Sequence, residues 1–143
     1  MPPSAPHQLA GRPLPAFARP ALSGARFDLA ATRGQVTIVK FFARYCEPCK
    51  RTLPAVQRLH TELPEVALVG ISEDESEEDA RALVAAYGLA FPVVLDRGNV
   101  LAGRYRVTDL PVTFVADRAG NLAWVGGPDQ SEADLEAAVR SLL

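Results

Sequence analysis

A strand that runs directly into a pair of cysteines is the feature that most constrains this chain. Residues Val36 to Phe42 are β-branched or aromatic and mostly apolar on both faces, as is typical of a central strand covered by helices on each side. Cys46 and Cys49 follow almost at once, and from Glu47 onward apolar residues recur at helical spacing until Pro64. The sequence therefore predicts a strand, a short connection, and a helix that begins on the cysteines.

The other segments predict an α/β fold with a mixed sheet. The expected elements are a short strand or hairpin near Arg26–Leu29, a buried strand at Val66–Ile71, a helix from Ser76 to Tyr87, an apolar piece at Phe91–Asp96, a brief helix at Val100–Tyr105, a hairpin of Val112–Ala116 and Leu122–Val125, and a terminal helix from Ser131. The alternation of strand and helix favours parallel strands in the first half, whereas the hairpin adds antiparallel ones. Helices then flank a central mixed sheet.

Length and charge limit the number of domains and the kinds of partner that this chain can have. The 143 residues suit one domain, 1–143, in which a Pro-rich arm at 1–22 is expected to be peripheral. The 15 basic and 17 acidic residues leave a net charge of −2 without a basic tract, so no nucleic-acid partner is expected. The apolar stretches are too short to cross a bilayer, and the prolines of the arm interrupt any signal-peptide pattern.

The cysteine pair can carry redox chemistry. The first-turn N–H groups and the helix dipole would favour a thiolate at Cys46, which would be the nucleophile. Cys49 lies one turn deeper on the same face, near enough to close a disulfide and resolve a mixed one. Pro48 suits the first turn of a helix, and Glu47 should oppose part of the dipole effect. The alternative is that the two cysteines are inert or form a structural disulfide. A strand that ends just before them and a helix that starts on them favour the redox interpretation.

Neither a metal nor a separate cofactor is expected. Structural zinc normally takes four Cys or His ligands, and beyond the cysteine pair the chain has only His7 and His60. The redox group would be the Cys46–Cys49 disulfide itself.

Four stretches resemble the TlpA/ResA-like thiol-disulfide oxidoreductases of the thioredoxin superfamily. They are Gly11–Phe17, Val39–Lys50, Phe91–Asp96 and Leu110–Val115. The Glu-Pro dipeptide between the cysteines is specific to the ResA-like branch. The resemblance implies a thioredoxin-like fold with an N-terminal extension, and a cis-proline at Pro111 that faces the cysteines. It also implies a substrate-contact surface formed by Tyr45, Glu47, Pro48 and Leu110.

Two positions outside the cysteine motif are further candidates for catalysis. The branch carries an acidic residue near the site, after the second central strand; counting from Tyr87 favours Glu75, whereas counting from the strand favours Glu73, and we choose Glu75. Lys40 stands where thioredoxins hold a buried Asp. It would be a proton donor or acceptor, an electrostatic stabiliser of a thiolate, or a snorkelling side chain without a role.

Function and location are expectations from the same resemblance. It implies a dithiol reductant of exported proteins, with oxidised apocytochrome c as one substrate, acting as a monomer in the periplasm or elsewhere outside the cytoplasm and recharged by a membrane electron donor. A cytoplasmic location is the alternative. The competing functions are a disulfide-forming oxidant and a non-catalytic binding module that uses the same groove.

Overall fold

A five-stranded mixed sheet forms the centre of the computed structural model, which describes every residue from Met1 to Leu143. The strand order is β5-β4-β3-β6-β7, with β3 at Thr37–Phe42, β4 at Ala67–Ser72, β5 at Val93–Leu95, β6 at Val112–Ala116 and β7 at Leu122–Gly126. The β3, β4 and β5 strands run parallel, while β6 is antiparallel to both β3 and β7. The predicted mixed sheet is thereby confirmed.

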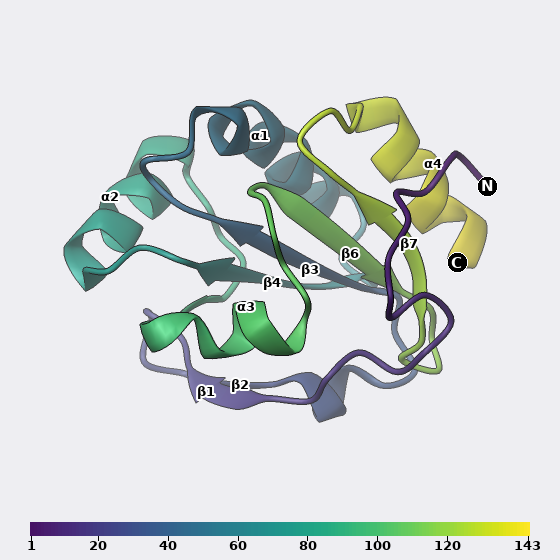
Figure 1. The fold of residues 1–143 in the computed structure, drawn as a ribbon, viewed down its shortest axis with the longest axis horizontal. Helices are drawn as coiled ribbons and strands as arrows, with labels where there is room; N and C mark the ends of the chain where they lie inside the picture. Colours follow the sequence, from purple (N-terminus) through teal and green to yellow (C-terminus); the bar gives the residue numbers. More distant parts are fainter.

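Helices cover the sheet unequally on its two faces (Figure 1). On one face lie α1 (Glu47–Glu62), α2 (Glu77–Tyr87) and α4 (Glu132–Leu142); on the other lie α3 (Val100–Arg104) and the hairpin of β1 (Ala18–Pro20) and β2 (Arg26–Asp28). Alternation along β3 divides its side chains between two apolar clusters. Ile38 and Phe42 pack with α1, whereas Val39 and Phe41 pack with α3 and the N-terminal residues.

The predicted capping residues begin the helices as expected. Ser76 Oγ accepts a hydrogen bond from the backbone N–H of Asp79 at 3.1 Å, and Ser131 Oγ accepts one from Asp134 at 3.0 Å. Gly88 ends α2 with a φ of 59°, a left-handed conformation that glycine adopts without strain. These local signals place α2 and α4 where the sequence predicted them.

Part of the Pro-rich arm packs into the core, so the expectation that the whole arm is peripheral does not hold. Leu14 and Phe17 are buried, and Trp124 Nε1 donates a hydrogen bond to the carbonyl of Pro3 at 3.0 Å. The arm runs along the outer edge of β7, where Ala5 N donates to Val125 O at 2.8 Å. Non-proline residues between the prolines thus supply the N–H groups that cover this edge strand.

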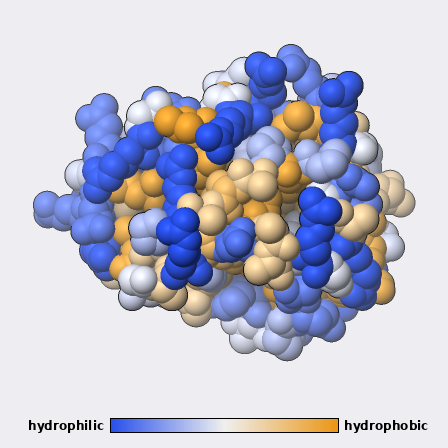
Figure 2. All heavy atoms as spheres, turned by 90° about the horizontal axis from the view of Figure 1, so that it is seen from below, coloured by the Kyte–Doolittle hydropathy of each residue, from blue (hydrophilic) through white to orange (hydrophobic).

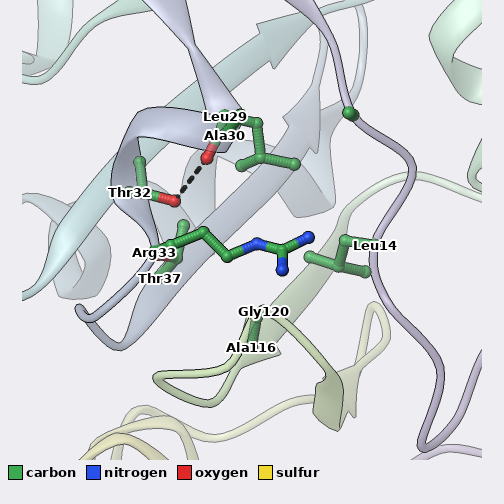
Figure 3. Close-up of a pocket in the computed structure, with 9 residues that line it drawn as sticks. Leu14, Leu29, Ala30, Thr32, Arg33, Thr37, Ala116 and Gly120 are labelled. Carbon is green, nitrogen blue, oxygen red and sulfur yellow. Dashed lines mark hydrogen bonds between the residues drawn. The ribbon is translucent and has the colours of Figure 1, made fainter.

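Two further features are the distribution of apolar atoms on one face and a small internal cavity. On the face that carries α3 and the β1–β2 hairpin, apolar atoms gather in the middle and polar side chains surround them (Figure 2). A cavity of about 30 Å³ beneath Arg33 is lined by Leu14, Thr37 and Ala116 and lies at the end of β3 away from the cysteines (Figure 3). No helix is long and apolar enough to span a membrane.

Candidate active site

The two cysteines lie at the beginning of α1 and form a disulfide. Cys46 is the N-cap residue, and its Sγ accepts a hydrogen bond from the backbone N–H of Cys49 at 3.2 Å. The Cα atoms are 5.3 Å apart, within the usual range for a disulfide. Cys46 is 8% exposed whereas Cys49 is fully buried, so Cys46 is the more accessible residue of the pair. This difference supports the predicted roles, with Cys46 as the attacking sulfur and Cys49 as the resolving one.

The first turn of α1 combines a favourable dipole with a screened negative charge. Pro48 lies at the second helical position, where no intrahelical partner for an N–H is lost. The Glu47 carboxylate is exposed and pairs with Lys50 Nζ at 2.8 Å. The N–H group that donates to Cys46 Sγ, together with the positive helix end, favours the thiolate of Cys46 after reduction.

Asp74 holds the loop before the cysteines, a role that the sequence analysis missed. The backbone N–H of Arg44 donates to the Asp74 carboxylate at 2.9 Å, and Ser72 Oγ donates to it at 2.9 Å. Asp74 is buried although it lies within a run of acidic residues that reads as solvated. The guanidinium of Arg44 pairs with Asp79 at 2.7 Å, which directs this side chain toward α2.

A groove of about 360 Å³ borders the cysteine loop. Tyr45 and Leu110 line it from two loops, Glu73 adds a carboxyl group, and the other lining residues lie between Asn99 and Asp109. The Leu110–Pro111 peptide bond is cis, as the resemblance implied. Tyr45 is 73% exposed beside Cys46, so a large aromatic surface is presented next to the reactive sulfur. This geometry suits an extended protein segment whose own sulfur approaches Cys46.

Glu73 lines this groove, whereas Glu75, the residue chosen from the sequence, does not. The Glu75 side chain is exposed, whereas Glu73 is buried and neither of its carboxylate oxygens receives a hydrogen bond from an N–H or O–H group. Burial, followed by a hydrogen bond to Asp96, raises the pKa of Glu73 to about 9. Asp96 itself accepts hydrogen bonds from the backbone N–H groups of Leu101 at 2.9 Å and Ala102 at 3.0 Å.

Replacing Glu73 with Gln is expected to change how stability depends on pH. Between the ordinary pKa of 4.5 and about 9, the folded state holds a proton on Glu73 that the unfolded chain has released. The free energy of unfolding therefore falls with rising pH in this window, and Glu73→Gln, whose amide does not titrate, removes that contribution. Urea unfolding at pH 5, 7 and 9 should show the variant gaining stability relative to the wild type as pH rises. Exposed Glu78→Gln is the control, and a pH-independent difference for Glu73→Gln would refute the assignment.

Lys40 lies beneath this site, fully buried in β3. Its Nζ has one hydrogen-bond partner, Thr113 Oγ1 of β6, at 3.1 Å. Burial lowers the pKa of Lys40 from 10.5 to about 7, and no carboxylate contributes to the shift. The snorkelling alternative is excluded, because the side chain does not reach solvent.

Comparisons with known proteins agree with this geometry. The AhpC/TSA family matches residues 10–125, a segment that includes the sheet, the cysteines and the cis-proline. The chain belongs to the AhpC/TSA family. Within it, thiol-disulfide oxidoreductase ResA from Bacillus anthracis is 28% identical over 134 residues, covering 92% of this chain and 78% of ResA. Thioredoxin-like protein YneN from Bacillus subtilis is 32% identical over 114 residues, covering 77% and 66%.

Solved structures place this AhpC/TSA member among the DsbE-like proteins. A secreted Mycobacterium tuberculosis disulfide oxidoreductase homologous to Escherichia coli DsbE is similar with a TM-score of 0.81 and 26% identity, covering 88% of this chain and 96% of that one. A thiol-disulfide oxidoreductase from Bacteroides fragilis shares the fold with a TM-score of 0.80 and 23% identity, covering 92% and 100%. The protein is a thiol-disulfide oxidoreductase of the ResA/DsbE type with a thioredoxin-like fold.

Proposed function

We propose that the protein is a dithiol reductant of disulfides in exported proteins. The observation that carries this proposal is the asymmetry of the cysteine pair: Cys46 retains 8% exposure at a helix N-terminus beside a groove, and Cys49 is fully buried behind it. One sulfur is therefore accessible to a protein disulfide, while the other is accessible only to Cys46. The pair carries the electrons itself, without a bound cofactor.

The catalytic cycle follows from this asymmetry. The Cys46 thiolate attacks a substrate disulfide and forms a mixed disulfide, and one substrate sulfur leaves as a thiolate. Cys49 then attacks Cys46 Sγ and releases the second substrate sulfur, which leaves the Cys46–Cys49 disulfide. Tyr45 and Leu110 would hold the substrate segment during both steps.

The charges of the first turn favour reduction over oxidation. An oxidant has a strongly stabilised thiolate, whereas Glu47 places a carboxylate beside Cys46 and reduces that stabilisation. Lys50 screens Glu47 only partly, since the Glu47 side chain is 81% exposed. The name of the ResA relatives supports thiol-disulfide exchange, and the description of the M. tuberculosis protein as secreted supports a site of action outside the cytoplasm.

The proposal also names a substrate and an electron donor. Apocytochrome c with an oxidised Cys-x-x-Cys-His pair is the substrate that the ResA resemblance suggests, and an extracytoplasmic reductant needs a donor that carries electrons across the membrane. We propose that the protein meets both as a monomer, with the same Tyr45–Leu110 groove facing each partner in turn.

The midpoint potential of the cysteine pair tests the direction of electron flow. The protein is equilibrated in thiol-disulfide buffers of graded potential, free thiols are trapped by alkylation, and the oxidised fraction is read by mass. A midpoint of about −270 mV, like that of thioredoxin, supports a reductant, whereas one of about −120 mV identifies a disulfide-forming oxidant. A pair that never exchanges with the buffer would leave only a non-catalytic binding module.

A further inference from the structure

The groove beside the cysteine loop continues past the cis-proline to the N-terminal arm. A cavity of about 180 Å³ shares Val107, Thr108 and Asp109 with that groove and is bordered by Pro111. A second cavity, of about 470 Å³, shares Thr108 with both of them and ends against the arm. Its lining residues are Pro6, His7, Gln8, Arg106 and Thr108. The three cavities therefore follow one another along the loop between α3 and β6 (Figure 1).

The arm forms a fixed wall at this far end of the groove. Ser4 Oγ accepts a hydrogen bond from the backbone N–H of Val125 in β7 at 2.8 Å. The His7 ring packs edge-on against Phe114 of β6, with 5.0 Å between the ring centroids, and its Nδ1 accepts from the backbone N–H of Leu9 at 3.0 Å. A substrate segment that extends along the loop therefore meets a preformed surface at the arm.

Arg106 occupies a backbone position that usually takes glycine. Its φ is 54°, in the left-handed region, directly after the end of α3. Its N–H and that of Val107 donate to carbonyl groups in the last turn of α3, at 3.2 and 2.9 Å, which closes the helix as a C-terminal glycine does. Gly88 has this place at the end of α2. A charged side chain that is kept at a strained position indicates a role for that side chain.

The guanidinium of Arg106 has no partner within the protein. Arg106 is exposed and forms no ion pair with a carboxylate. The other titratable residues that line the two farther cavities are His7 and Asp109, and Asp109 also borders the groove beside the cysteines. A segment that lies along the loop thus passes the Asp109 carboxylate first and then reaches an unpaired cation at the arm.

We propose that Arg106 and the arm form a subsite for an acidic side chain of the substrate protein, at the end of the groove away from the sulfur that Cys46 attacks. The inference rests on the proposed exchange reaction and adds sequence selectivity to it. A carboxylate matches the guanidinium because the two form paired hydrogen bonds as well as an ion pair. The near end of the groove presents the exposed ring of Tyr45, so the two ends select different side chains.

Peptide disulfides that carry a single acidic residue test the subsite. Each peptide has one cysteine joined to an aromatic thiol; attack by Cys46 on the peptide sulfur forms a mixed disulfide and releases the aromatic thiolate, which absorbs light. One glutamate is moved through the positions before and after the cysteine, with glutamine at the others. At the position that reaches Arg106, glutamate should raise the second-order rate constant of the reduced protein about three- to fivefold over the all-glutamine peptide at low salt. About 1 M salt should remove most of this gain.

Three variants separate the subsite from a structural role of this loop. Arg106→Gly removes the charge and relieves the left-handed residue, so it should unfold at the same or a higher urea concentration, yet react at nearly equal rates with the glutamate and glutamine peptides. Arg106→Asn, which also tolerates this conformation, should lose the preference in the same way. Arg104→Gln is the matched control, because Arg104 is exposed in the last turn of α3 and lines none of the three cavities. It should keep the preference.

The outcomes that overturn the subsite differ from failure of the exchange reaction. A preference that survives in Arg106→Gly, or that disappears in Arg104→Gln, overturns the inference. Equal rates for every glutamate peptide and the all-glutamine peptide would exclude the acidic subsite and leave the exchange reaction intact. If the cysteine pair did not exchange with disulfides, no peptide would release the aromatic thiolate, and the proposed function would fail together with the inference.

Discussion

Replacing Cys46 with serine is expected to abolish disulfide reduction, with a loss of roughly a thousandfold or more, because a neutral hydroxyl cannot replace a thiolate as the nucleophile. Cys49 cannot substitute for it, since its side chain is fully buried beneath the first turn of α1. The measurement is the rate at which a protein disulfide is reduced in the presence of excess dithiol. Cys46→Ser should give only the rate of the dithiol alone.

The variant Cys49→Ser is the matched control, since it removes a sulfur of the same pair but leaves the nucleophile. It should still attack substrate, but the mixed disulfide on Cys46 should persist and be detectable as an adduct by mass. Accumulation of adducts on Cys49 in Cys46→Ser instead would reverse the order of attack. Equal residual activity in both variants would indicate that the pair acts in binding rather than in exchange.

The sequence predicted the sheet and its helices well because local signals and periodicity agreed. The buried run at Val36–Phe42 and the capping serines Ser76 and Ser131 point to the same elements that the structure contains. The N-terminal arm was interpreted incorrectly because prolines are read as signs of a loop. An edge strand needs only occasional N–H groups, and Ala5 and Gly11 supply them to β7.

Cys46 and Cys49 could be predicted because the residues that make them reactive are neighbours in the sequence. Residues whose properties depend on burial in the folded protein could not be predicted. Glu73 and Glu75 have the same side chain and lie two residues apart. Their difference arises because β4 ends at Ser72, so that Glu73 still turns inward against Asp96 whereas Glu75 has left the sheet. The sequence of an acidic run does not show which of its carboxyl groups will be buried and have a raised pKa.

Replacing Lys40 with methionine is expected to raise the stability of the folded protein, the second large effect that the structure predicts. The folded pKa of about 7 lies below the ordinary value of 10.5, so between these values the unfolded chain holds a proton that the folded state has released. Stability of the wild type therefore rises with pH in this window and is lowest below about pH 7, where a charged ammonium is buried. The shift corresponds to a penalty of roughly 5 kcal/mol, of which Lys40→Met removes all.

The net gain is smaller because the variant leaves Thr113 without its partner, at a cost of about 1–3 kcal/mol. We expect Lys40→Met to be about 2–4 kcal/mol more stable than the wild type at pH 6, measured by denaturant unfolding of the oxidised form. This advantage should disappear or reverse above about pH 10, where the amine is neutral in both states. Thr113→Val controls for the lost hydrogen bond. A constant difference across this pH range would mean that Lys40 is not neutralised on folding.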